Sequence, residues 1–176
     1  MQRIFLLTTG GTIEKVYSEQ KGVVENRAAK LERYLRMLRL PDADIRTLHL
    51  MNKDSLEMTD ADRAEVRDCV AKLLPEDAPI VISHGTDTMV ETGLFLERTL
   101  TDLKVPVILT GAMTPLGFEG SDALQNLTES LLAARLLTAG VFVVMHGQVF
   151  PVSQVRKDKD KATFIWKYAR PATSIE

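Results

Sequence analysis

The stretch Ile4-Phe5-Leu6-Leu7-Thr8-Thr9-Gly10-Gly11-Thr12 decides the fold class of this chain. Its apolar run from Ile4 to Leu7 suits a strand that is covered on both faces of a parallel sheet. Two adjacent glycines end the stretch; they allow backbone angles closed to other residues and a close approach of a ligand. Ligands of open α/β sheets bind at the carboxyl ends of the strands. The stretch therefore predicts a central strand followed by a binding turn with Thr12 at its mouth.

The glycine pair is a weak signal by itself. It lacks the Lys-Ser/Thr of a phosphate-binding P-loop and the spacing of a G-x-G-x-x-G dinucleotide motif. A tight turn with a purely structural threonine is an equally good interpretation until other stretches agree.

Composition predicts one globular domain over residues 1–176, with a loose tail at 170–176. Hydrophobic residues make up 45% and charged residues 26% of the chain, which is ordinary for a soluble protein. A net charge of -2 and a pI near 6.0 give no electrostatic footprint for nucleic acid or an anionic membrane. The first apolar run is too short for a signal peptide or a membrane span, and Cys69 has no second cysteine to pair with. We expect a cytoplasmic protein with neither kind of partner.

Apolar strands alternate with amphipathic helices along most of the chain. This βαβ spacing predicts an α/β fold with a doubly wound, mostly parallel, flavodoxin-like sheet in three αβα layers. Strands are expected at 4–7, 45–51, 79–84, 105–110 and 141–145. The last thirty residues break the rhythm, and we expect a hairpin-like extension made of 148–154 and 162–168 around the charged run 156–161.

Two helix starts carry a capping pattern, a hydroxyl residue followed three positions later by an acid. These are Thr59 with Asp62 and Thr88 with Glu91. The second pair predicts a helix that begins at Asp87 or Thr88, just beyond a strand.

Three expected strand ends bring hydroxyl groups to one edge of the sheet: Thr12, Ser55 and Thr86. Asp54 and Asp87 lie beside two of them. The helix N-terminus after Thr86 favours a carboxylate through its free N–H groups, and Asp87 suits an ammonium group. Opposite charges in one pocket indicate an amino acid as the ligand, although simple helix capping remains an alternative for Asp87.

Three motifs resemble those of the bacterial-type L-asparaginases, in the same order and with similar spacing. They are Thr9-Gly10-Gly11-Thr12-Ile13, His84-Gly85-Thr86-Asp87-Thr88-Met89 and Leu109-Thr110-Gly111-Ala112-Met113. The resemblance extends from Ile4 to about Lys157. It implies hydrolysis of L-asparagine to L-aspartate and ammonia by a threonine nucleophile, without a metal or an organic cofactor.

The resemblance also implies catalytic roles. Thr12 matches the nucleophilic threonine, and Tyr17 is the candidate for a mobile-loop tyrosine that helps to activate it. Thr86 matches a second catalytic threonine with Asp87 beside it, and Lys157 falls where the family places the lysine that accompanies this threonine.

The implied substrate contacts come from the same motifs. Asp87 holds the amino group, Ser55 contacts the α-carboxylate, and the backbone carbonyl of Ala112 contacts the side-chain amide. Gly11, Gly85 and Asp54 flank these positions and complete the expected binding set.

The chemistry asks for a base, because a threonine hydroxyl is a poor nucleophile until its proton is removed. From a reference pKa near 10.4, neutralising a lysine at pH 7 takes about 4.6 kcal/mol. Lys157 therefore either has a lowered pKa or acts through its charge. One charge in a solvated run is the alternative for Lys157, and Lys159 is the alternative for the role.

Family members usually carry a second, C-terminal domain, which lends residues to a neighbour's site. We expect a chain that lacks this domain to be either an isolated N-terminal domain or a short form that completes its site in a homo-oligomer, a dimer or a tetramer. Leu56 stands where secreted members often have glutamine. Because one methylene is worth about 1–3 kcal/mol of discrimination, weak or no glutaminase activity is expected.

Two other functions fit the same pocket: an amino-acid sensor without turnover and a subunit of an amidotransferase. A metal site is not expected, since His49, His84 and His146 lie far apart without ligand spacing. His84 is expected to be a hydrogen-bonded histidine at a strand end.

Overall fold

A six-stranded sheet organises the chain. The computed structural model describes residues 1–18, 23–26, 29–116 and 118–168, without the side chains of 14–18, 23–26, 29 and 30. The strand order is β4-β1-β5-β6-β7-β8, and the first five are parallel. Their bounds are β1 (Gln2–Gly10), β4 (Ala43–Lys53), β5 (Ile80–Ser83), β6 (Pro106–Thr110), β7 (Gly140–Met145) and β8 (Gln148–Pro151). In chain order the parallel strands run 2-1-3-4-5, so the predicted flavodoxin-like sheet is confirmed.

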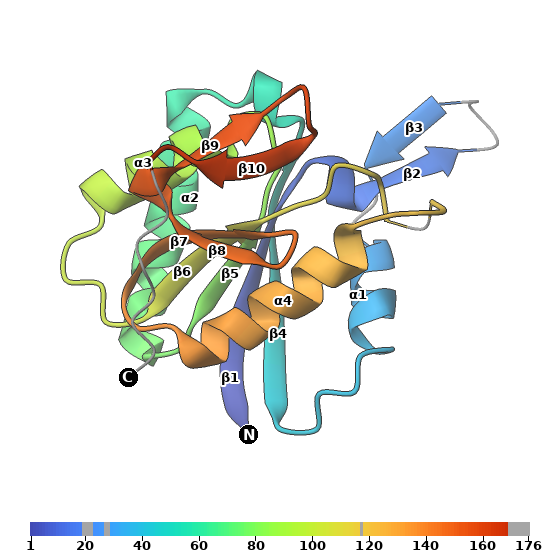
Figure 1. Ribbon diagram of the computed structural model, residues 1–176. Helices are drawn as coiled ribbons and strands as arrows, with labels where there is room; N and C mark the ends of the chain where they lie inside the picture. The colour runs from blue at the N-terminus through green and yellow to red at the C-terminus, as the bar shows by residue number, and fades with distance from the viewer. Residues whose placement is uncertain (19–22, 27–28, 117, 169–176) are drawn as a thin grey trace.

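Helices cover both faces of this sheet (Figure 1). They are α1 (Ala29–Leu35), α2 (Asp60–Leu73), α3 (Met89–Thr99) and α4 (Ala123–Leu136). Alternate residues of β1 point to opposite faces: Ile4 and Leu6 pack in the layer of α1 and α4, whereas Phe5 and Leu7 pack in the layer of α2 and α3. Burial on both sides explains the unbroken apolar run of the sequence.

The two predicted helix starts have different outcomes. Thr59 and Asp62 form a complete capping box at the start of α2, and Lys53 pairs with the same Asp62 carboxylate. Thr88 does precede α3, but its side chain caps no helix amide. Its hydroxyl donates instead to the backbone carbonyl of Ser55, at 2.8 Å. The prediction of a Thr88 cap is therefore wrong, because a tertiary partner takes the hydroxyl.

The C-terminal extension is a hairpin, but its strands pair differently from the expectation. Gln148–Pro151 forms β8, an antiparallel neighbour of β7. The hairpin consists of β9 (Val155–Asp158), inside the charged run, and β10 (Thr163–Trp166). The Phe150 and Trp166 rings pack with centroids 4.9 Å apart. Apolar packing thus attaches the hairpin to the sheet.

Two hairpins lie at the end of the molecule where the parallel strands finish (Figure 1). One is β9–β10, and the other is β2 (Lys15–Ser18) with β3 (Val23–Asn26). Single turns of 3-10 helix complete the chain: η1 (Thr12–Glu14), η2 (Ser55–Glu57), η3 (Leu74–Glu76) and η4 (Val152–Gln154). The expected tail at 170–176 lies outside the described residues.

In the described ranges, no helix combines the length and the apolar character that crossing a membrane requires. Cys69 is partly buried and packs against the core.

Candidate active site

Glycines bring the predicted strand ends into contact. A Cβ on Gly11 would lie 2.5 Å from the backbone nitrogen of Gly85, and a Cβ on Gly85 would lie 2.5 Å from the Ser55 hydroxyl. Contacts this short mean that a side chain at either position would force its neighbours to shift. The turn before Thr12, the turn before Thr86 and the buried Ser55 are therefore packed directly together, as the sequence predicts.

The third motif joins the same contact. A Cβ on Gly111 would lie 2.4 Å from the backbone oxygen of His84 and 3.4 Å from the Thr86 methyl group. Ala112 follows and is fully buried. All three motifs therefore meet at the carboxyl edge of the sheet.

Lys157 reaches this edge from the β9–β10 hairpin. Its Nζ donates to the Thr86 hydroxyl at 2.7 Å and to the Asp87 carboxylate at 2.9 Å. The Thr86 side chain is buried, and the Lys157 side chain is only 15% exposed. We call Thr86, Asp87 and Lys157 the Thr86 cluster. Lys159, the alternative in the sequence, lies just beyond the end of β9 and is exposed.

The remaining predicted residues are placed as follows. The Asp54 carboxylate accepts from the backbone nitrogen of Leu56, at the start of η2. Thr12 is half-buried at the first position of η1. The backbone of Tyr17 belongs to β2, and its side chain lies outside the described part of the structure.

His84, the first residue of the second motif, is fully buried. Its Nδ1 donates to the Gly85 carbonyl at 2.7 Å, whereas Nε2 has no hydrogen-bond partner among the described residues. The expectation of a hydrogen-bonded histidine therefore holds for one ring nitrogen. Burial lowers the pKa of His84 to about 4, which keeps the imidazole neutral near pH 7.

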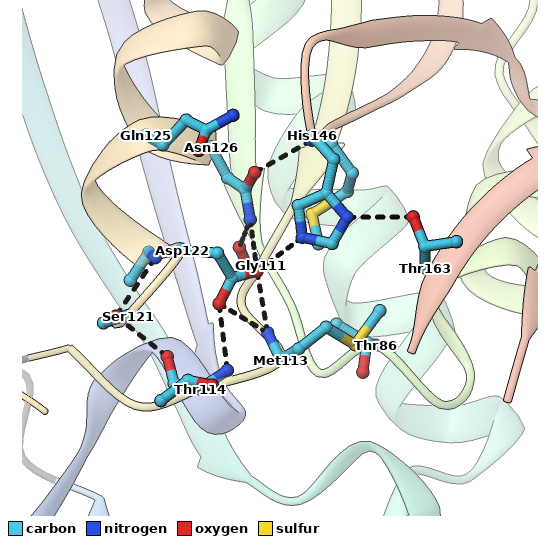
Figure 2. A network of polar contacts seen from close by, with 12 residues as sticks. Thr86, Gly111, Met113, Thr114, Ser121, Asp122, Gln125, Asn126, His146 and Thr163 are labelled. Carbon is cyan, nitrogen blue, oxygen red and sulfur yellow. Dashed lines mark hydrogen bonds and ion pairs between the residues drawn. The ribbon is translucent and has the colours of Figure 1, made fainter. Parts of the chain in front are cut away.

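A second polar group, which the sequence did not reveal, lies beside Gly111 and Met113 (Figure 2). It consists of Asp122, Asn126 and His146, and we call it the Asp122 network. The Asp122 carboxylate accepts hydrogen bonds from the backbone nitrogens of Met113 and Thr114, at 2.9–3.0 Å.

The same carboxylate accepts from Asn126 Nδ2 and from His146 Nε2, both at 2.8 Å. Asn126 also donates to the Gly111 carbonyl and accepts from the His146 backbone nitrogen. His146 and Gly147 form the turn between β7 and β8, and both take a positive φ there. Asn126 and Asp122, the partners of His146 in this network, are 20 and 24 residues away from it, and no local sequence pattern identifies them.

A large cavity lies elsewhere. It has a volume of about 850 Å³ and lies beside the edge strand β4, where Arg36, Ile45 and Leu73 contribute to its wall. Arg3 and Ala43 also line it, so it lies toward the amino ends of β1 and β4. Ligands of such sheets bind at the opposite, carboxyl edge. Chemistry and position therefore favour the polar site at the carboxyl edge.

Comparison with known proteins gives one consistent family. Residues 3–165 match the family described as "Asparaginase, N-terminal". An L-asparaginase of Thermococcus kodakarensis is 30% identical over 155 residues, which is 88% of this chain and 47% of that protein. A glutamyl-tRNA(Gln) amidotransferase subunit of Pyrococcus horikoshii is 34% identical over 152 residues, 82% of this chain and 34% of that protein.

Solved structures agree. "The thermostable L-asparaginase from Thermococcus kodakarensis" superimposes with a TM-score of 0.84 at 29% identity, over 94% of this chain and 51% of that one. The chain thus spans about half the length of the L-asparaginases that it matches.

Proposed function

The chain belongs to the asparaginase family, and on that premise we propose that it is an amidohydrolase that converts L-asparagine to L-aspartate and ammonia. The contact between Lys157 and the Thr86 hydroxyl is the observation that carries the proposal. It joins a lysine to a buried hydroxyl 71 residues away in the sequence, at the edge where three motifs meet. Capping or surface solvation would not require this contact.

In the proposed reaction, the Thr12 hydroxyl attacks the carboxamide carbon. The new oxygen–carbon bond gives a tetrahedral intermediate. Its collapse breaks the carbon–nitrogen bond, and the leaving NH₂ group takes up the proton lost by the Thr12 hydroxyl and departs as ammonia. Water then hydrolyses the ester and regenerates Thr12. Backbone N–H groups of the glycine turns are suited to stabilise the oxyanion.

The Thr86 cluster moves the protons in this proposal. Lys157 bonds to both Thr86 and Asp87, so the substrate's ammonium group competes with Lys157 for the Asp87 carboxylate. Substrate binding thereby leaves the lysine free to exchange a proton through Thr86. No organic cofactor or metal is needed in these steps.

The substrate's other groups have polar residues near them. Ser55 is buried beside Gly85 and suits the α-carboxylate, with Asp54 next to it. The Ala112 carbonyl suits the carboxamide N–H₂. Because Ala112 is fully buried, the substrate needs a small opening movement at this rim before it can reach that carbonyl.

Ammonia release from L-asparagine by the purified chain tests the proposal directly. We expect turnover of asparagine and slower or undetectable turnover of glutamine, since one methylene allows about 10–200-fold discrimination. The Thr12→Ala variant is the control for contaminating activity. Absence of ammonia from both amides would remove the hydrolase assignment.

A second candidate function is a component of an amidotransferase, which the similarity to the Pyrococcus horikoshii amidotransferase protein favours. Ammonia release that appears only with charged tRNA or a second protein component would support it. A sensor is the third arm of the same experiment: asparagine would raise the melting temperature without any release of ammonia.

We also propose a cytoplasmic homo-oligomer, in which a neighbouring copy completes the site. Light scattering measures the mass of the particle directly. A monomer with full asparaginase activity would contradict this part of the proposal and leave the reaction itself intact.

A further inference from the structure

The peptide groups on both sides of Ala112 are held in fixed orientations. On one side the Gly111 carbonyl accepts from Asn126 Nδ2 at 3.0 Å, and on the other the Met113 N–H donates to the Asp122 carboxylate at 3.0 Å. A trans peptide is planar, with its C=O and N–H pointing in opposite directions. The bond between Met113 and Asp122 therefore directs the Ala112 carbonyl away from Asp122.

Asp122 is placed where an aspartate ordinarily caps a helix, yet it does not do so. It precedes α4, but its side chain accepts no bond from the first amides of that helix. The Ser121 hydroxyl accepts from the Ala123 backbone nitrogen instead, at 3.1 Å. The Asp122 carboxylate is thus free for the loop, where it accepts two backbone N–H groups.

This carboxylate stays ionised although it is partly buried. Burial raises the pKa of Asp122, but the N–H groups of Met113 and Thr114, with His146 and Asn126, outweigh burial and hold the pKa below its usual value. An ionised acceptor makes shorter and stronger hydrogen bonds than a neutral one.

His146 connects the loop to the hairpin that carries Lys157. Its Nε2 donates to Asp122, and its Nδ1 lies 2.9 Å from the Thr163 hydroxyl on β10. With the ring proton on Nε2, Nδ1 accepts from that hydroxyl. In the hairpin register, Phe164 pairs with Lys157. One set of contacts therefore fixes both the Ala112 loop and the strand of the lysine.

The Ala112 carbonyl itself has no hydrogen-bond donor among the described residues, although Ala112 is fully buried. A buried carbonyl without a donor costs free energy. A carboxamide N–H₂ group supplies such a donor, whereas the carboxylate of aspartate does not.

We propose that Asp122 is a positioning residue that aims the Ala112 carbonyl at the amide nitrogen of the substrate, with His146 holding Asp122 in place. The inference rests on the proposed function. It gives Asp122 and His146 a role in the preference of the site for the side-chain amide of asparagine over the side-chain carboxylate of aspartate.

The test compares asparagine with aspartate in the Asp122→Ala variant. We expect kcat/KM for asparagine to fall about 10- to 100-fold, the range for one misdirected hydrogen bond. The inhibition constant of aspartate should stay within about twofold, because aspartate makes no bond to this carbonyl. Equal weakening of both ligands, or of neither, would overturn the inference.

Ser121→Ala is the matched control. It removes the hydroxyl at the start of α4 and the bond of this hydroxyl to the Thr114 carbonyl. The bonds from the Met113 and Thr114 N–H groups to Asp122 stay in place. We expect lower stability and an unchanged ratio of the asparagine and aspartate constants. A change in that ratio as large as that of Asp122→Ala would contradict a specific role for Asp122.

Two milder variants keep the inference testable if Asp122→Ala does not fold. Asp122→Asn keeps an oxygen for the loop amides, and His146→Asn keeps a residue that tolerates positive φ in the turn. Each should lower kcat/KM for asparagine about 3- to 10-fold with aspartate inhibition unchanged. Normal kinetics in both would overturn the inference.

Amide hydrogen exchange separates failure of the inference from failure of the proposed function. The amides of Met113 and Thr114 should exchange faster in Asp122→Ala than in Ser121→Ala, whether or not the wild-type chain releases ammonia. Unchanged exchange means that Asp122 does not hold the loop. An inactive wild type with the expected exchange would remove the hydrolase assignment alone.

Discussion

The Thr86 cluster and the Asp122 network both adjoin Gly111, and they differ in how completely their hydrogen-bonding groups are used. Lys157 divides its ammonium group between Thr86 and an exposed Asp87. Asp122 accepts from four residues, and His146 uses both ring nitrogens. The Thr86 cluster can exchange hydrogen-bond partners, whereas the Asp122 network cannot do so without losing a hydrogen bond.

This difference matches what each group is proposed to do. Proton transfer needs groups that change partners during the reaction, whereas positioning needs a supporting shell whose bonds are all satisfied. Substitutions in the Thr86 cluster should therefore lower turnover with little effect on folding. Substitutions in supporting contacts should lower stability or alignment first.

The largest expected effect is that of removing a threonine hydroxyl. Thr12→Ala and Thr86→Ala should each lower kcat for asparagine by roughly 10³–10⁵-fold, as loss of a nucleophile or its partner does in other hydrolases. Ammonia release and thermal unfolding, measured together, should show lost turnover with a retained fold. Near-normal turnover in either variant would take that threonine out of the mechanism, and Thr86→Ser is the matched control that keeps a hydroxyl.

Lys157→Met comes next. If the lysine moves a proton in the transition state, kcat should fall roughly 10²–10⁴-fold. Lys159→Met is the matched control on the same hairpin, and its kcat should stay within about twofold because the side chain is exposed and lies outside the Thr86 cluster. A larger loss from Lys159→Met would reverse the assignment of the lysine.

Gly11→Ala should lower both stability and turnover, unlike substitutions in either group, because this glycine supports the fold and also lines the candidate site. The new methyl group would lie 2.5 Å from the Gly85 nitrogen at a φ of +83°. We expect a loss of about 2–4 kcal/mol in the free energy of unfolding, together with loss of turnover. Urea unfolding at pH 7 measures the first. Wild-type stability would show that the turn yields easily.

His84 provides a supporting contact that depends on pH. Its folded pKa is about 4, against 6.5 for the unfolded chain, and burial is the largest cause. Between these values the unfolded state binds the proton more readily, so stability falls as the pH falls from 6.5 to 4, by up to roughly 3 kcal/mol.

Urea unfolding across this window measures the effect of His84. Asp62, whose pKa is lowered to about 2 chiefly by its hydrogen bond from Lys53, loses its contribution only below pH 3.8. His84→Gln should flatten the curve between pH 6.5 and 4. An unaltered slope in that variant would assign the titration to another group.

Thr59→Ala should have the smallest effect. Loss of the capping box of α2 should cost about 1 kcal/mol of stability and leave kcat/KM unchanged, since the box contacts neither polar group. A fall in kcat/KM would show that the start of α2 is coupled to the candidate site.

The sequence was sufficient for most features that depend on neighbours along the chain. The apolar runs predict the strands, and the spacing of Thr59 and Asp62 predicts a capping box that the structure contains. The expected strand ends predict that Thr12, Ser55 and Thr86 share one edge, because the parallel strands of such a sheet all end on the same side. The family resemblance follows from the three glycine-containing motifs.

Only the tertiary structure decided which side chains meet. Thr88 has the sequence of a cap but bonds to Ser55, and Lys157 rather than Lys159 bonds to Thr86. Asp122 and His146, 24 residues apart, carry no local signature of their contact. The physical reason is that secondary structure follows from periodicity over a few residues, whereas these hydrogen bonds depend on how strand ends and hairpins pack in three dimensions.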